Sequence, residues 1–152
     1  MFAAMQGAQN QGALIEGTFL VNGALAKILF DSGASHSFIA RSFMHDIGLH
    51  LENLWVPLEI SLPVRRPVLL DSVCRTVEVS FDGFSFVADL VVLSMAEYDI
   101  ILGMDWLSFN RVCQDCFDKM VYFLLLGKDD IVIATAKGNS FAEAFFITLG
   151  RW

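Results

Sequence analysis

The sequence predicts a mostly β domain, a compact barrel or sandwich with one or two short helices. Short apolar runs alternate with turn signals at roughly even spacing along the 152 residues. Asn22-Gly23 and Asp82-Gly83 each stand between two such runs, which is the pattern typical of a β-hairpin. No segment between the runs has the composition of a linker, so we expect one domain.

The composition excludes several classes of protein. Hydrophobic residues make up 55% of the chain and charged residues 18%, which argues against intrinsic disorder. The formal net charge of −7 argues against nucleic-acid binding by this domain alone. No apolar run approaches the roughly 20 residues of a membrane-spanning helix, and we expect no membrane partner. Three cysteines without a visible secretory leader predict reduced thiols and a cytoplasmic location.

The first half of the chain is expected to contain a leader, a hairpin and a helix. Residues 1–12 are rich in Gln, Ala and Gly and are expected to form a loose leader to a domain over 13–126. Strands are predicted at 14–21 and 24–30. Ser37 is then expected to cap a helix over 38–47, with three apolar side chains on one face and Gly48 at its end.

The second half is predicted to consist of short strands and one further helix. The helix is expected at about 104–109, after a Gly turn. Residues 127–152 are expected to be a C-terminal extension that is partly strand. The predicted strands are 54–62, 68–74, 77–81, 84–93, 99–102, 121–126 and 131–135.

The tripeptide Asp31-Ser32-Gly33 carries side chains that could take part in a reaction, and it follows the apolar strand at 24–30 directly. Gly33 has no side chain, so backbone N–H groups can approach the Asp31 carboxylate, and the Ser32 hydroxyl can brace the loop or a partner loop. The small side chain of Ala34 permits close packing. Peptide hydrolysis without a metal or a covalent intermediate requires two carboxylates that share a proton, of which this sequence supplies one.

Two segments of the sequence carry a family resemblance. Residues 30–39 read FDSGASHSFI and resemble the active-site segment of retropepsin-type aspartic proteases, in particular those of plant gypsy-type LTR retrotransposons. Residues 98–107 read YDIILGMDWL and are similar to the segment that supports the catalytic loop in that family. The resemblance covers roughly residues 14–123, and the two motifs occur in the family's order and spacing.

The resemblance implies an acid-protease half-barrel that works as a two-fold homodimer on a peptide or polyprotein substrate, with no cofactor and no metal. Asp31 would be the catalytic aspartate, Ser32 would hydrogen-bond to the partner subunit's loop, and Gly33 and Ala34 would complete the catalytic loop. The residues implied to pack under that loop are Ile100, Ile101, Leu102 and Gly103. The hairpin over 58–74 would be the flap, and its tip would contain Pro63, Val64, Arg65 and Arg66.

The sequence also departs from the family and leaves alternatives open. The predicted flap tip lacks the usual glycine, and Met104 stands where retroviral relatives often carry Arg. A catalytically inactive or domesticated copy, acting as a dimerisation or binding module, is the main alternative to an endopeptidase. Cys113 and Cys116 form a CxxC that could serve thiol redox chemistry, although the helix start typical of such motifs is not predicted there. Arg65 and Arg66 could contact acidic substrate residues or simply be solvated.

Overall fold

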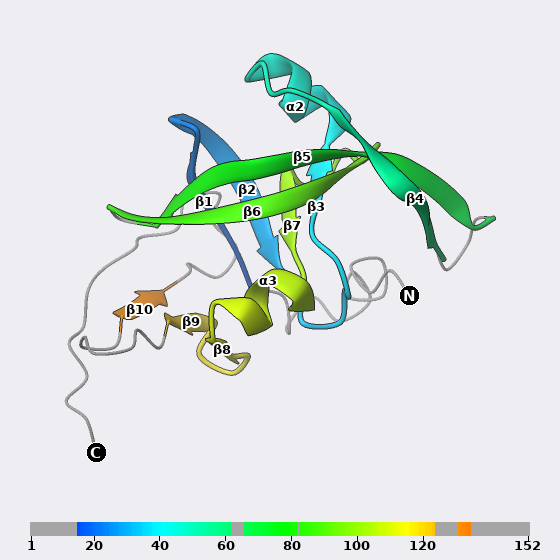
Figure 1. Ribbon diagram of the computed structural model, residues 1–152. Coiled ribbons are helices and arrows are strands. Elements are labelled where there is room, and N and C mark those ends of the chain that lie inside the picture. The colour runs from blue at the N-terminus through cyan, green and yellow to red at the C-terminus, as the bar shows by residue number, and fades with distance from the viewer. Residues whose placement is uncertain (1–14, 62–65, 82, 124–130, 135–152) are drawn as a thin grey trace.

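The computed structural model describes residues 15–61, 66–81, 83–123 and 131–134, and in this part of the chain the fold is mostly β (Figure 1). A seven-stranded sheet has the order β1-β2-β7-β3-β6-β5-β4, and a further pairing of β1 with β5 closes it on itself. The strands are β1 (Ile15–Val21), β2 (Ala24–Phe30), β3 (Phe38–Ala40), β4 (Glu52–Ile60), β5 (Val68–Phe81), β6 (Phe84–Leu93) and β7 (Ile100–Leu102). The predicted half-barrel is therefore confirmed.

Two helices and a second small sheet complete the described structure. The helices are α2 (Arg41–Asp46), which follows β3, and α3 (Met104–Phe109), which follows β7. Because β3 and β7 are antiparallel, the two helices lie at opposite ends of the sheet (Figure 1). The second sheet has the order β10-β9-β8 and consists of β8 (Val112–Asp115), β9 (Met120–Phe123) and β10 (Ile131–Ala134).

The first hairpin is confirmed as predicted. β1 and β2 pair antiparallel from Ile15↔Phe30 to Val21↔Ala24. Asn22 and Gly23 between them have φ values of 47° and 82°, the left-handed pair that a two-residue type I′ turn requires. At the second hairpin signal β5 and β6 pair antiparallel up to Phe81↔Phe84, while Asp82 lies outside the described residues.

The helix predicted over 38–47 is shorter than expected, and its first part is wrong. Phe38, Ile39 and Ala40 form β3, which pairs parallel with β6 and antiparallel with β7. All three side chains are buried, so sheet pairing on both sides decides their conformation rather than helical periodicity. The N-cap of α2 is Ala40 without a side-chain cap, and Ser37 makes other bonds. Gly48, at φ +68°, ends the helix region as predicted.

Two further strand predictions need correction. The strands predicted at 68–74 and 77–81 are one strand, β5, whose pairing with β6 shifts register between Cys74 and Val77. At this irregularity Thr76 has φ +55° and donates its N–H to Asp89 Oδ1 at 2.9 Å. β8 was not predicted, since its sequence VCQD has no apolar alternation and it pairs with β9 across a turn.

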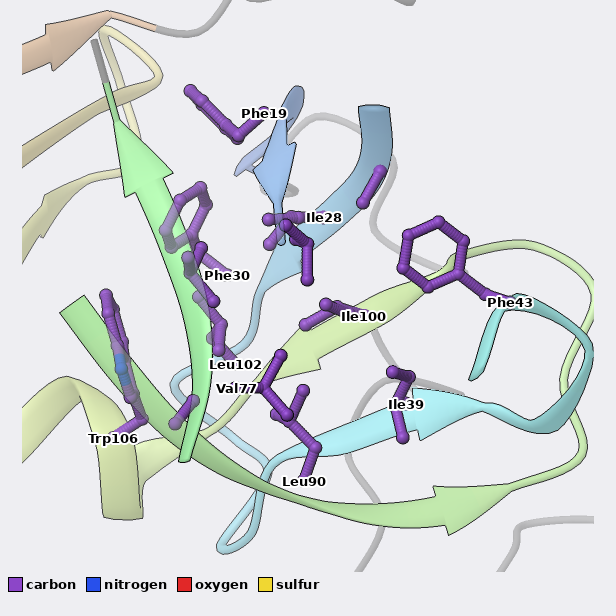
Figure 2. Packing of buried hydrophobic residues seen from close by; sticks show 14 of the residues in the cluster. Phe19, Ile28, Phe30, Ile39, Phe43, Val77, Leu90, Ile100, Leu102 and Trp106 are labelled. Carbon is purple, nitrogen blue, oxygen red and sulfur yellow. The ribbon is translucent and has the colours of Figure 1, made fainter. Parts of the chain in front are cut away.

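The main core lies between the curled faces of the seven-stranded sheet, where Figure 2 shows side chains from β1, β2, β3, β6 and β7 converging. Phe81 is fully buried at its centre, with ring centroids 4.8 Å from Phe19 and 5.3 Å from Phe123. A second cluster lies on the other face of β2 and β7. Its buried members are Leu29, Ala34, Phe38, Ile60, Leu70, Val73, Val91, Leu93 and Ile101.

Several sequence-based expectations lie outside the described residues. These are the leader at 1–12, Pro63, Val64 and Arg65 at the predicted flap tip, and the extension at 127–152 apart from β10. The predicted strand at 121–126 is described as β9 only to Phe123. The division into leader, domain and extension stays a prediction.

Candidate active site

Asp31 lies immediately after β2, at the point where the chain leaves the sheet. Its N–H donates to the carbonyl of Leu102 on β7 at 2.9 Å, which extends the parallel pairing of the two strands into the loop. The Asp31 Oδ1 atom accepts the Gly33 N–H at 2.9 Å, and the Ala34 N–H donates to the Asp31 carbonyl at 3.2 Å. The loop therefore holds the carboxylate through backbone donors, as the sequence predicts for a glycine at this position.

The second carboxylate oxygen of Asp31 is buried and has no hydrogen-bond partner among the described residues. Burial raises the pKa of Asp31 above its ordinary value, and the backbone N–H groups of Gly33 and Ala34 oppose that shift. A carboxyl held in this state favours the protonated form more than a solvent-exposed aspartate does. Such a group is suited to sharing a proton with a second carboxylate.

The short strand β7 ends directly beside the Asp31 loop. Ile100, Ile101 and Leu102 are all buried and pair with β2 and β3. At Gly103 a Cβ atom would lie 2.1 Å from the His36 carbonyl oxygen and 2.8 Å from that of Ala34. The loop therefore packs directly on the backbone of Gly103, which only glycine allows. Leu102 and Gly103 contact this loop through their backbones, whereas Ile100 and Ile101 pair with β2 and β3; the role of residues 100–103 as support of a catalytic loop stays a prediction.

Ser37 connects the loop to the start of α3. Its buried hydroxyl accepts the Gly103 N–H at 3.0 Å and donates to Asp105 Oδ1 at 2.6 Å. The same Asp105 oxygen accepts the Trp106 N–H at 2.7 Å. The Met104 N–H, in turn, donates to the Ala34 carbonyl at 2.7 Å. Sequence reasoning assigned Ser37 to a helix cap and missed this link, because its partners lie far along the chain.

A second link missed from the sequence joins β1 to the segment before β7. The Tyr98 hydroxyl donates a short hydrogen bond to Glu16, and Lys27 Nζ lies 5.1 Å from the centroid of the Tyr98 ring. The Lys27 N–H donates to Asp99 Oδ2 at 2.8 Å, and the Asp99 N–H donates to the Lys27 carbonyl at 2.9 Å. These bonds fix the 98–99 segment on β2.

Tyr98 also lies within electrostatic reach of the Asp31 loop. It packs against the second cluster, which includes Leu29 and Ala34 on either side of Asp31. Burial raises the pKa of Tyr98 strongly, and the hydrogen bond to Glu16 and the negative charges of Glu16, Glu97 and Asp31 raise it further. The Tyr98 hydroxyl is therefore neutral at all ordinary pH values.

The predicted flap corresponds to the paired ends of β4 and β5, which project from the sheet as an arm (Figure 1). The pairing runs from Glu52↔Val73 to Ile60↔Val68, with a register shift between Asn53 and Leu58. Leu54, Leu58 and Val68 pack against the second cluster, on the same face as Leu29. Of the four predicted tip residues, only Arg66 is described, and it is exposed. The role of this hairpin as a flap stays a prediction.

The other groups weighed in the sequence do not assemble into a site in the part of the chain that is described. Cys74 is buried, whereas Cys113 in β8 and Cys116 just after it are exposed free thiols, and no helix begins at this pair. The described residues contain no cluster of three or more His, Cys, Asp or Glu side chains that could hold a metal ion. They also contain no helix of the length and apolar character needed to cross a membrane.

Comparisons with known proteins agree with this geometry. The family model described as retroviral aspartyl protease matches residues 2–128. No curated protein sequence matches the chain. The chain belongs to the retroviral aspartyl protease family.

Two solved structures are similar to this chain at low sequence identity, and the first of them shares its fold. The retroviral protease-like domain of Ddi1 from Leishmania major has a TM-score of 0.55 and 16% identity, covering 80% of this chain and 94% of that one. The EIAV protease in complex with the inhibitor HBY-793 has a TM-score of 0.49 and 16% identity, covering 62% of this chain and 85% of that one.

Proposed function

We propose that this chain is an aspartic endopeptidase that acts as a homodimer, with Asp31 of each subunit at the two-fold axis. The observation that carries the proposal is the state of the Asp31 carboxyl. One of its oxygens is held by the Gly33 N–H, and the other is buried without a partner among the described residues. Chemistry with two carboxylates needs a second aspartate, and the sequence holds a single Asp-Ser-Gly motif. A second copy of the chain supplies the second aspartate.

The neighbouring Ser32 supports the same arrangement. Ser32 is exposed, and its hydroxyl has no hydrogen-bond partner among the described residues, although its two neighbours in the loop, Asp31 and Gly33, are hydrogen-bonded to each other. In the proposed dimer this hydroxyl reaches the loop of the second copy. The two loops would then brace each other across the axis and hold both carboxylates at the distance that proton sharing requires.

The proposed reaction uses one protonated and one ionised Asp31 carboxyl. The ionised group removes a proton from a water molecule, whose oxygen attacks the peptide carbonyl, while the protonated group donates its proton to the carbonyl oxygen. The carboxyl that took the water proton then donates it to the nitrogen of the tetrahedral intermediate, the other carboxylate accepts a proton from one hydroxyl of the intermediate, and the C–N bond breaks, which returns both carboxyls to their starting states. Since both protonation states are needed at once, the rate should follow a bell-shaped pH profile with its optimum below neutrality.

For the substrate we propose a retrotransposon polyprotein, supported by the resemblance of residues 30–39 and 98–107 to plant gypsy-type elements. If the protein binds peptides and dimerises but never cleaves them, the alternative of a non-catalytic dimerisation or binding module is correct instead.

Subunit mixing tests the proposal. Asp31→Asn keeps the shape of the side chain and removes the acid–base group, so the variant alone should lose activity by several orders of magnitude. When an excess of Asp31→Asn chain exchanges with wild-type chain, activity per wild-type chain should fall in proportion to the wild-type fraction. A fully active monomer in sedimentation and dilution assays, unaffected by the variant, would refute both the dimer and the mechanism.

A further inference from the structure

A hollow of about 360 Å³ lies between α2 and the chain that leaves β6, which is large enough for a small ligand. It is at the end of the sheet opposite α3 and the Asp31 loop (Figure 1). Among the described residues its lining consists of Arg41, Ser42, His45, Ser94 and Met95, and none of these is acidic. The hollow therefore presents polar donors and no carboxylate.

The pairing of β3 with β6 brings the two sides of the hollow together. Ala40 and Leu93 are partners at the last positions of these parallel strands. The residues that follow, Arg41 and Ser94, therefore leave the sheet side by side. Arg41 and His45 are four positions apart on α2, so they lie on one face of the helix. Donors from two separate elements thus surround one position.

Both sides of the hollow are held in place by the fold. Phe43 and Met44 anchor α2 because they are buried, and Phe43 points into the core (Figure 2). The Ala40 N–H donates to the Asp99 carbonyl at 2.8 Å, which fixes the start of the helix. Met95 packs against both hydrophobic clusters and is the apolar part of the lining. The donors are therefore carried by an ordered frame.

The polar groups of this lining have no protein partners in the part of the chain that is described. The Arg41 guanidinium has no carboxylate within 4 Å. The hydroxyls of Ser42 and Ser94 and the ring of His45 make no hydrogen bond there. Each of these side chains can donate a hydrogen bond, so a ligand can accept from all of them.

A phosphate monoester group matches these donors better than a carboxylate does. It carries close to two negative charges near pH 7 and has three terminal oxygens that accept strongly. A guanidinium binds two oxygens of such a group in a fork, which leaves the third for hydroxyl and imidazole donors on the other sides. A carboxylate has two oxygens only, and one guanidinium satisfies both.

We propose that the hollow between α2 and β6 binds a phosphate monoester group, with Arg41 as the main ligand and Ser42, His45 and Ser94 as further donors. The group comes from a phosphorylated small molecule or from a phosphorylated side chain of a protein, and the experiment separates these sources. The inference does not depend on the proposed function, because the site lies at the opposite end of the sheet from Asp31.

Amide NMR of the full ¹⁵N-labelled chain at physiological ionic strength tests the site. The probes are phenyl phosphate and the peptide acetyl-Ala-phosphoserine-Ala-amide, with acetate and the unphosphorylated peptide as controls. Both phosphate probes should shift the signals of residues 41–45 and 94–95 in a saturable way, with a Kd of about 1 mM for the tighter probe. Acetate should bind about tenfold more weakly, and the unphosphorylated peptide should cause no shift.

Two variants remove donors from opposite sides of the hollow. Arg41→Gln should weaken phosphate binding about tenfold, and Ser94→Ala about threefold. Both side chains are exposed, so the variants should keep the amide spectrum of the folded chain elsewhere. Arg111→Gln is the matched control, because Arg111 is an exposed arginine that follows α3 at the other end of the sheet, and it should leave the Kd unchanged.

The results distinguish the site from unspecific attraction of anions. Shifts that do not saturate, shifts that lie away from residues 41–45 and 94–95, or an unchanged Kd in Arg41→Gln would overturn the site. Acetate that binds as tightly as phenyl phosphate would overturn the assignment to a phosphate group. Saturable binding that Arg41→Gln weakens supports the site, and the probe that then binds more tightly identifies the small molecule or the protein side chain as the source.

Discussion

Replacing Ser37 by alanine isolates the contribution of the link between the Asp31 loop and α3. The Ser37 side chain is 1% exposed, and its hydroxyl accepts the Gly103 N–H at 3.0 Å. Alanine leaves that buried N–H without its acceptor, which costs about 1–3 kcal/mol. The lost bond to Asp105 adds little, because Asp105 is exposed and water can replace the hydroxyl. We expect a loss of about 2 kcal/mol in the free energy of unfolding.

The measurement is urea unfolding followed by far-UV circular dichroism at one fixed protein concentration, since association couples to stability. Ser35→Ala is the matched control. Ser35 is exposed, its hydroxyl contacts His36 Nδ1 at 2.9 Å, and its loss should change the free energy of unfolding by less than about 0.5 kcal/mol. If Ser37→Ala is as stable as Ser35→Ala, the hydroxyl does not carry the link and the reasoning from buried donors is wrong.

Three further predictions follow from the same structure. Gly103→Ala should yield little folded protein in an expression and circular dichroism assay, because its Cβ would lie 2.1 Å from the backbone oxygen of His36; a wild-type melting curve would contradict this. Asp31→Asn should raise the melting temperature near pH 7. Burial raises the pKa of Asp31 in the folded chain above its unfolded value of 3.8, so the wild-type chain loses stability as the pH rises from the unfolded to the folded pKa. The gain should disappear below about pH 4, and destabilisation at pH 7 would contradict the argument. Phe81→Ala should lower the free energy of unfolding by about 3–5 kcal/mol in urea titrations, since the ring is fully buried among other aromatic rings. Phe81→Leu, which leaves a smaller cavity, should lower it clearly less. Equal losses in the two variants would argue against a cavity effect.

The features predicted correctly from the sequence depend on local chemistry. Asn22-Gly23 encodes its turn through residues that tolerate positive φ, and Gly33 was identified from its place beside Asp31. The conformation of residues 38–40 could not be predicted in this way, because their periodicity fits a helix while their partners β6 and β7 lie far along the chain.

The same distinction applies to the candidate site. The Asp31 loop is a contiguous motif, so its residues were found together. The Ser37–Asp105 and Glu16–Tyr98 pairs join positions 68 and 82 residues apart, and neither pairing has a local signal in the sequence. Only the placement of β7 between β2 and β3 brings such positions together.

That placement has a consequence for biosynthesis. Residues 28–30, directly before Asp31, pair with residues 100–102, and the Asp31 N–H bonds to Leu102. A nascent chain therefore cannot form the Asp31 loop as described until the ribosome has released residues beyond Gly103. Such long-range closure is slow compared with the local β1–β2 hairpin. A polypeptide interrupted before Ile100 therefore leaves the edges of β2 and β3 without their partner β7, and the Asp31 loop without its contacts to Leu102 and Gly103. The order of synthesis therefore delays assembly of the candidate site until Gly103 has been translated.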